Sequence, residues 1–281
     1  MKKILVTGCN GQLGRAINKE YEHDNVELIN TDVGELDITD VSKVVEFVEQ
    51  HKPDVIINCA AHTNVNACET EWDLAYKINA IGPRNLSIAA SKVGAKMIHV
   101  STDYVFDGTG TEPYNEFSPV APLGAYGRTK LAGEEFVKQF ADKFFIIRTA
   151  WLYGDGKNFV KTMISLGKDK GEVSVVGDQI GSPTSTKELA KMIHVLEPTD
   201  NYGLFHGTCE GYCSWADFAE KIFEYCNMDV KVNHITTDEF PTPAKRPAYS
   251  VLDNYMLKLT TDFEFAQWED ALLEYVNSGL I

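Results

Sequence analysis

The sequence predicts an α/β protein in which a doubly wound parallel sheet carries a smaller α/β lobe. The first 150 of its 281 residues alternate short β-branched runs with longer amphipathic segments, a pattern typical of parallel strands joined by helices. A glycine-rich turn joins the first run to the first amphipathic segment, and Asp32 directly follows the second run. Both features are typical of a sheet that binds a ligand at the carboxyl ends of its strands.

The strands and helices of the first half follow from hydrophobic periodicity. Short runs rich in Val, Ile and Thr predict strands at Lys3–Thr7, Val26–Thr31, Val55–Cys59, Met97–Thr102 and Phe144–Thr149. Apolar residues at intervals of three and four positions predict helices at Gln12–Glu22, Val41–His51, Trp72–Val93 and Tyr126–Phe140. Asp40 is a good N-cap for the helix that begins at Val41.

The pattern loosens after Arg148, where glycine and proline become more frequent. Here the sequence predicts a strand at Val173–Val176 and helices at Asn158–Leu166, Lys187–Leu196 and Trp215–Cys226. We expect residues 1–150 to form one domain and residues 151–281 to form mainly a second lobe. Residues 172–200 are expected to return to the first domain, with Val173–Val176 and the helix after it extending its sheet.

Composition and charge exclude several classes of protein. The formal net charge of −15 at pH 7 disfavours binding to nucleic acid or anionic lipid, because both are polyanions. The N-terminal run MKKILVTG begins directly as a strand, and no later segment reaches membrane-spanning length. We therefore expect a cytoplasmic protein with no membrane partner. Six scattered cysteines suit reduced thiols, and Cys209 and Cys213 lack a second ligand pair, so no structural metal is expected.

The glycine-rich turn predicts a dinucleotide site in the first domain. It reads Thr7-Gly8-Cys9-Asn10-Gly11-Gln12-Leu13-Gly14, and such glycines let backbone N–H groups and the positive end of a helix approach a pyrophosphate. A purely structural strand-to-helix turn is the alternative. Asp32 favours the dinucleotide, because a carboxylate there accepts hydrogen bonds from an adenosine ribose. The same carboxylate repels a 2′-phosphate, which favours NADH over NADPH.

A candidate catalytic group lies at the end of the fourth predicted strand and in the helix that follows. The strand ends in Ser101-Thr102-Asp103, and Tyr126 and Lys130 lie four residues apart. On a helix this spacing places the phenol and the ammonium on one face. We expect the ammonium to lower the pKa of the phenol from about 10, which would make it a proton donor and acceptor near neutrality. A surface pairing of Tyr and Lys is the alternative.

Several longer motifs are more specific than the glycine-rich turn. They are VTGCNGQLG, DVIINCAAHT, STDYVFDG, YGRTKLAGE, RTAWLYG and DQIGSPT. With them, most of the chain resembles the extended short-chain dehydrogenase/reductase superfamily and, within it, the dTDP-4-dehydrorhamnose reductase family. The resemblance implies a Rossmann-type fold, NADH or NADPH as cofactor, and a nucleotide-sugar substrate bound by the second lobe.

The resemblance also implies a reaction and a set of roles. The 4-keto group of dTDP-4-dehydro-L-rhamnose would be reduced, with Thr102 on the carbonyl, Tyr126 as proton donor, and Lys130 holding the ribose and tuning Tyr126. Substrate contacts are implied at Thr102, Asp103 and Trp151, although Trp151 suits packing between the lobes equally well. Cofactor contacts are implied at Gly8, Gly11, Gln12, Leu13, Asp32, Asp37, Ile38, Ala61, His62, Thr63, Tyr126 and Lys130.

Other functions stay open at this point. Related 4-epimerases and other nucleotide-sugar 4-ketoreductases share these motifs, and the sequence does not locate the contacts that set specificity. The related 4,6-dehydratases have Asp-Glu after the strand-end threonine, whereas this chain has Asp103-Tyr104. A non-catalytic, dinucleotide-binding regulatory subunit is the alternative from another class, and the intact Tyr126 and Lys130 argue against it. Some relatives bind magnesium at a dimer contact. No residues here identify such a metal site, and a homodimer stays open.

Overall fold

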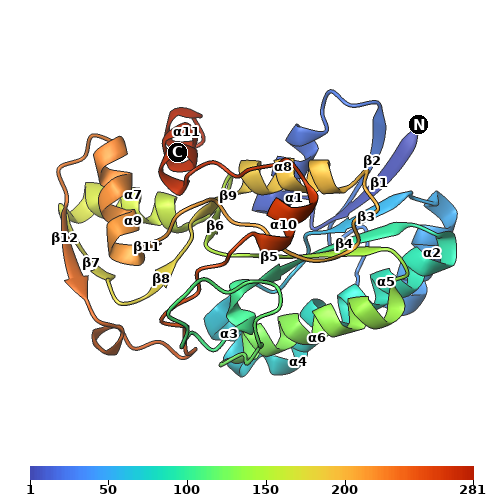
Figure 1. Ribbon diagram of the computed structural model, residues 1–281, viewed down its shortest axis with the longest axis horizontal. Helices are drawn as coiled ribbons and strands as arrows, with labels where there is room; N and C mark the ends of the chain where they lie inside the picture. The colour runs from blue at the N-terminus through green and yellow to red at the C-terminus, as the bar shows by residue number, and fades with distance from the viewer.

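A six-stranded parallel sheet forms the centre of the molecule (Figure 1). The computed structural model describes residues 1–281. The strand order is β10-β5-β4-β3-β1-β2, and every neighbouring pair is parallel. The strands are β1 (Lys2–Thr7), β2 (Val26–Thr31), β3 (Val55–Asn58), β4 (Lys96–Thr102), β5 (Phe144–Thr149) and β10 (Gly203–His206). The predicted doubly wound α/β fold is confirmed.

Helices cover both faces of the sheet (Figure 1). One face carries α1 (Gln12–Glu20) and α8 (Thr186–Leu196), and the other carries α2 (Val41–His51), α5 (Gly82–Val93) and α6 (Ala125–Phe140). Successive strand side chains point to opposite faces, and so Ile4 and Val6 join the core on the α1 side while Leu5 joins the core on the α2 side. The interiors of the inner strands β1, β3 and β5 are apolar because helices bury both faces, whereas the edge strand β2 carries Glu27 and Asn30.

The smaller lobe packs at one end of the sheet (Figure 1). Its helices are α7 (Phe159–Lys170), α9 (Trp215–Tyr225) and α11 (Trp268–Asn277), and α10 (Tyr255–Thr260) returns to contact β10. Its strands form three parallel or antiparallel pairs. These are β7 (Glu172–Val176) with β12 (Lys231–Ile235), β6 (Leu152–Tyr153) with β9 (Thr184–Ser185), and β8 (Ile180–Gly181) with β11 (Cys213–Ser214).

One expectation about the main sheet is wrong. The strand at Val173–Val176 does not extend it but pairs in parallel with β12 in the smaller lobe. The sheet edge beside β5 is occupied instead by β10. Val173 and Val175 are buried in the same core as the side chains of α7 and α9, so the strand buries its apolar face locally. The following helix, α8, does return and packs against α1.

The helix predicted at Trp72–Val93 contains an irregular turn. After α3 (Val65–Thr70), the chain forms α4 (Trp72–Tyr76), a π-helical turn at Lys77–Ile81, and then α5. Pro83 lies at the start of α5 and has no N–H to donate to the preceding turn. Such π turns often occur at functional sites, and this one carries the buried Asn79.

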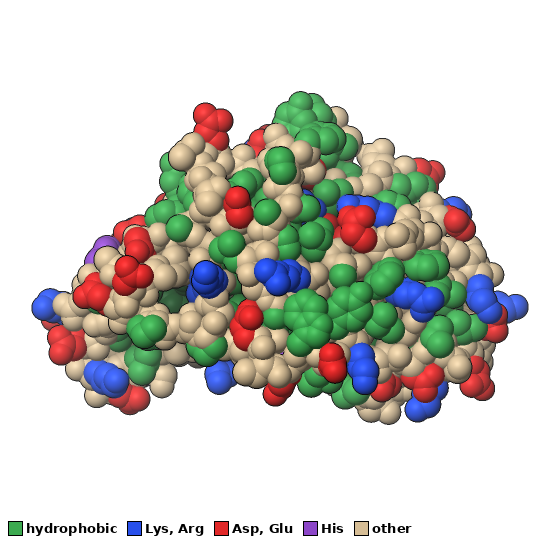
Figure 2. Space-filling view, turned by 90° about the horizontal axis from the view of Figure 1, so that it is seen from below, with side chains coloured by type: hydrophobic (Ala, Val, Ile, Leu, Met, Phe, Trp, Pro, Cys, Tyr) green, Lys and Arg blue, Asp and Glu red, His purple; other side chains and the backbone are tan.

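The surface bears charges of both signs. Figure 2 shows acidic and basic side chains interspersed on the face seen from below, so no basic patch offsets the excess of carboxylates there. None of the helices combines the length and the apolar character that crossing a bilayer requires. All six cysteines are free thiols.

Candidate active site

The glycine-rich turn is shaped by the absence of side chains. Gly8 has a φ of +66°, and a Cβ built there would lie 2.7 Å from the backbone nitrogen of Ala60. A Cβ on Gly14 would lie 2.4 Å from the carbonyl oxygen of Gly8. No ordinary side chain fits at either position. Gly11 is the N-cap of α1, so the helix begins directly at the turn and directs its positive end there.

A cleft of about 370 Å³ lies over this turn and contains half of the predicted cofactor positions, namely Gly8, Gly11, Asp32, Asp37, Ile38 and Ala61. The Asp32 carboxylate accepts hydrogen bonds from the backbone N–H of Val33 (2.8 Å) and of Asn10 (3.3 Å). The Asp37 carboxylate accepts from the backbone N–H and the hydroxyl of Thr39, which holds the pKa of Asp37 below its usual value. Neither Lys nor Arg lines the cleft.

Four other predicted cofactor residues direct their side chains elsewhere. Gln12 Oε1 accepts from the backbone N–H of Gly154 (2.9 Å), so this side chain reaches towards the smaller lobe. Leu13 is buried in the core. His62 pairs through Nε2 with an oxygen of Glu71 at 2.9 Å, and Thr63 is exposed. The structure therefore does not bring these four side chains into the cleft.

Thr102, Asp103 and Tyr126 meet at the carboxyl end of β4. Thr102 is the last residue of the strand, and Asp103 opens a short 3-10 turn, Asp103–Val105. The Thr102 hydroxyl donates to Asp103 Oδ1 (2.9 Å) and accepts from the backbone N–H of Tyr104 (3.2 Å). A Cβ on Gly127 would lie 2.1 Å from the carbonyl oxygen of Tyr104. The missing side chain lets α6 approach the strand end closely, which brings Tyr126 to Thr102.

The pKa of Tyr126 differs from the sequence expectation. Burial raises it above the usual value, and the Thr102 hydroxyl lowers it only in part. The expected net lowering by Lys130 is wrong for this arrangement, because the loss of hydration of the phenolate outweighs the favourable contacts. Tyr126 consequently holds its proton at neutral pH and can act as a proton donor.

Lys130 is almost completely buried, with 2% of its surface exposed. Its ammonium donates to the Val100 carbonyl at 2.6 Å. Burial lowers the pKa of Lys130 to about 8, while the charges of Glu134 and Cys59 act to raise it. Cys59 also lines the cleft, and so the charge of Lys130 lies beside the cleft.

The Asp103 carboxyl group is buried and only partly paired. Oδ1 accepts from Thr102, whereas Oδ2 has no hydrogen-bond partner. Burial raises the pKa of Asp103 to about 6, against the lowering effect of the nearby Ser250 and Thr102 hydroxyl groups. An unpaired buried acceptor next to a strand-end hydroxyl is suited to a donor on a bound ligand.

Trp151 lies where the chain leaves β5 for the smaller lobe. Its ring stacks on that of Trp215, with ring centroids 3.5 Å apart and planes 9° from parallel. Its backbone has a φ of +47°, a region that bulky residues rarely adopt. A Cβ on Gly181 would lie 2.5 Å from the indole ring. The structure thus places Trp151 in tight aromatic packing at the entrance to the smaller lobe.

Two buried polar residues near the site were not singled out from the sequence. Asn79 accepts from the backbone N–H of His62 (2.7 Å) and donates to the hydroxyl of Thr129 (3.1 Å), which ties the loop beside the cleft to α6. Glu134 is fully buried and pairs with Arg148. Both occupy helix positions facing the core, and a polar residue on such a face is the sequence signal that could have identified them.

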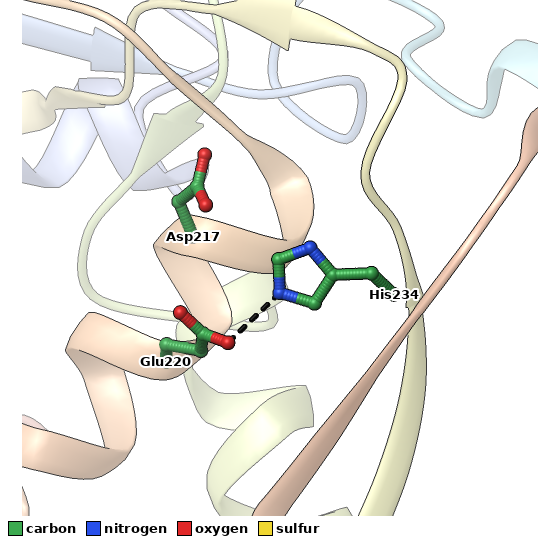
Figure 3. Close-up of side chains that lie close together, drawn as sticks. All are labelled: Asp217, Glu220 and His234. Atoms are coloured by element: carbon green, nitrogen blue, oxygen red, sulfur yellow. Dashed lines mark hydrogen bonds and ion pairs between the residues drawn. The ribbon is translucent and has the colours of Figure 1, made fainter.

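A separate cluster lies on the surface of the smaller lobe (Figure 3). Asp217 and Glu220 on α9 approach His234 on β12, and all three are exposed. Asp217 accepts from the backbone N–H and hydroxyl of Ser214 and so caps α9. Glu220 pairs with His234 at 2.8 Å. Helix capping and a surface ion pair account for the cluster.

Comparisons with known proteins identify the family of the chain. The family model described as the RmlD substrate binding domain matches residues 1–280. A dTDP-4-dehydrorhamnose reductase from Aggregatibacter actinomycetemcomitans is 40% identical over 97% of each chain. A solved dTDP-4-dehydrorhamnose reductase from Clostridium acetobutylicum is 58% identical, with a TM-score of 0.98 over 99% of this chain and 100% of that one.

A second solved structure adds a bound dinucleotide. The dTDP-4-dehydrorhamnose reductase from Bacillus anthracis, in complex with NADP, is 48% identical and has a TM-score of 0.96 over 98% of this chain and 99% of that one. The identities and the nearly complete coverage confirm the family resemblance seen in the motifs. The chain therefore belongs to the RmlD family of dTDP-4-dehydrorhamnose reductases.

Proposed function

We propose that this protein uses NADH or NADPH to reduce the 4-keto group of dTDP-4-dehydro-L-rhamnose, giving dTDP-L-rhamnose. The observation that carries the proposal is the arrangement of Thr102, Tyr126 and Lys130 at the carboxyl end of β4, beside the cleft over the glycine-rich turn. Family membership supports the choice of substrate. The NADP bound by the Bacillus anthracis relative supports the class of cofactor.

The cleft suits a nicotinamide dinucleotide. The cradle at Gly8 and Gly14 has no room for a Cβ, and the N-terminus of α1 opens onto it. We infer that Asp32 binds the adenosine ribose and that Lys130 holds the second ribose. The other proposed contacts are Gly8, Gly11, Asp37, Ile38, Ala61 and Tyr126, with Gln12, Leu13, His62 and Thr63 limited to backbone contacts. When bound, the reduced nicotinamide supplies the hydride for C4 of the sugar.

The residues of the chain then orient the carbonyl and supply the proton. The Thr102 hydroxyl turns from Asp103 Oδ1 to the substrate oxygen and stabilises the developing negative charge. Tyr126, whose raised pKa keeps it protonated, donates its proton to that oxygen as the alkoxide forms. Lys130 places a positive charge nearby, which favours the charged transition state.

The sugar nucleotide is proposed to lie between the first domain, residues 1–150, and the smaller lobe. Asp103 offers Oδ2 as an acceptor for a sugar hydroxyl. Trp151 stands at the boundary between the lobes with its ring stacked on Trp215, and we infer that it contacts the substrate there. The smaller lobe, mainly residues 151–281, would supply the remaining contacts.

The test is the oxidation of NADH and NADPH, followed by absorbance, with dTDP-4-dehydro-L-rhamnose as substrate. Tyr126→Phe removes the proton donor, and we expect kcat to fall by about 100-fold or more while dinucleotide binding persists. Tyr225→Phe, in the smaller lobe, is the matched control and should leave kcat unchanged.

Two other outcomes would replace the proposal. Dinucleotide binding without oxidation by the unaltered chain would indicate a regulatory subunit. Retention of NAD⁺ through extensive dialysis, with interconversion of sugar epimers and no net oxidation, would indicate an epimerase.

A further inference from the structure

Glu134 forms a buried junction one helical turn after Lys130. Its side chain is fully buried on α6. Oε1 accepts from the Ser101 hydroxyl (2.6 Å) and from Arg148 Nε (2.9 Å), and Oε2 accepts from Arg148 Nη2 (2.7 Å). One carboxylate thus connects α6 to the ends of both β4 and β5.

The two partners of Glu134 adjoin the reacting region. Ser101 and Arg148 are opposite each other in the β4–β5 register, and each directly precedes the last residue of its strand. For β4 that last residue is Thr102. The bidentate contact with Arg148 has a defined geometry, so it fixes both strand ends relative to the turn of α6 that carries Lys130.

Close packing holds the same part of α6 in place. A Cβ on Gly133 would lie 2.2 Å from the carbonyl oxygen of Asn79 in the π-helical turn. The helix therefore contacts backbone on this side and is tied to the strands by Glu134 on the other. A change at residue 134 should shift the position of Lys130 and Thr102 relative to each other.

The charges around Lys130 make Glu134 important electrostatically as well. The titratable groups that act on Lys130 or on its partner Glu134 are Cys59 directly after β3, His99 on β4, Arg148 on β5 and Glu134 on α6. His99 is neutral, because burial and the charge of Lys130 hold its pKa well below the usual value. Glu134 is the carboxylate in this group. Without it, Lys130 and Arg148 would be two buried cations with no counterion.

We propose, on the basis of the reductase function inferred above, that Glu134 is a positioning residue for the reaction. Its carboxylate binds Ser101 and Arg148 so that Thr102 and Lys130 keep one relative geometry, and it balances the positive charge of Lys130 and Arg148. Glu134 itself touches neither substrate nor cofactor. It acts through the residues that do.

The experiment compares Glu134→Gln, which keeps the shape and removes the charge, with Glu134→Asp, which keeps the charge. Glu135→Gln is the matched control, because Glu135 is the next residue of α6, is exposed, and pairs with Lys138. For Glu134→Gln we expect kcat to fall by about 10- to 100-fold, with KM changed by less than about threefold.

The pH profile separates positioning from simple structural damage. Glu134 raises the pKa of Lys130, so its neutralisation lets the ammonium deprotonate at lower pH. In the plot of kcat against pH, the alkaline limb of Glu134→Gln should therefore move by about one pH unit or more towards lower pH. Glu134→Asp should restore most of the original position of this limb. The pH profile of Glu135→Gln should superimpose on that of the unaltered protein.

Two results would overturn the proposal. One is a folded Glu134→Gln variant with kcat within twofold of the unaltered protein and the same pH profile. The other is a loss of kcat that is uniform across pH and parallels a lower melting temperature, which indicates a structural role only. If Glu134→Gln does not fold, the double variant Glu134→Gln with Arg148→Met removes both charges. We expect this double variant to fold and to have a kcat at least about tenfold below that of the unaltered protein. A kcat equal to that of the unaltered protein would contradict the proposal.

A binding measurement keeps this inference separate from the reductase assignment. NADH and NADPH affinities, followed by nucleotide fluorescence from pH 6 to 9, require no turnover. As pH rises, the dinucleotide affinity of Glu134→Gln should begin to fall about one pH unit earlier than the affinity of the unaltered protein. If the unaltered chain binds a dinucleotide but never oxidises it, the reductase assignment fails while this shift still tests the role of Glu134.

Discussion

The two ends of the site are built in opposite ways. The glycine-rich turn depends on missing side chains, since neither Gly8 nor Gly14 has room for a Cβ. The catalytic strand end depends on charged side chains that are almost fully buried, with Asp103, Lys130 and Glu134 each no more than 2% exposed.

This difference determines what each end responds to. The energetic cost of steric overlap rises steeply when one methyl group is added to a tightly packed site, and this cost does not depend on pH. The energy of a buried ionisable group depends on whether it is protonated, and a pKa shift of one unit corresponds to about 1.4 kcal/mol. The turn should therefore be sensitive to shape, and the strand end should be sensitive to pH.

The largest effect is expected for Gly8→Ala. The new Cβ combines a left-handed backbone with a contact 2.7 Å from Ala60, which together cost about 4 kcal/mol. Dinucleotide binding should fall below detection in a fluorescence titration, equally at pH 6 and pH 9. Gly34→Ala is the control, because a Cβ there meets nothing within 4 Å. A Gly8→Ala protein with normal affinity would show that the turn is not a tight cradle.

The next effect tests the strand end through stability. In the folded protein Asp103 keeps its proton up to about pH 6, whereas its ordinary pKa is 3.8. Folded stability is therefore lost as pH rises between these values, by about 3 kcal/mol in total. Asp103→Asn should be more stable than the unaltered protein above pH 6, with the gain vanishing below pH 4.

Chemical denaturation at several pH values measures this effect. Asp107→Asn is the contrasting control, because hydrogen bonds from Thr109 hold the pKa of Asp107 below its usual value. That substitution should give no gain in stability at neutral pH. A stability gain for Asp103→Asn that is the same at every pH would contradict the electrostatic account, since the variant would then be acting through packing.

The smallest effect concerns the choice of cofactor. Asp32 lies in a cleft without Lys or Arg, so we expect the unaltered protein to bind NADH more tightly than NADPH. Asp32→Asn should shift the ratio of the two dissociation constants by about tenfold towards NADPH, or about 1.4 kcal/mol. Glu35→Gln, a nearby change of the same charge, should shift it by less than about twofold. An unchanged ratio in Asp32→Asn would show that the 2′-phosphate does not approach this carboxylate.

Local pattern was enough to predict most of the first domain. The five strands from Lys3 to Thr149 and the turn at Gly8–Gly14 lie where periodicity placed them. Their positions could be predicted because β-branched runs, helical periodicity and glycine spacing are local properties of the sequence. The strand at Val173–Val176 was assigned to the wrong partner, since an apolar strand does not specify which edge it will join.

The sequence by itself determined the fold class, the family motifs and the residue types of the site. Only the tertiary structure decided the direction of the Tyr126 pKa and which predicted cofactor side chains face the cleft. It also revealed the Glu134–Arg148 pair. The physical reason is that desolvation and ion pairing depend on groups far apart in the chain, such as residues 101, 134 and 148, which only folding brings into contact.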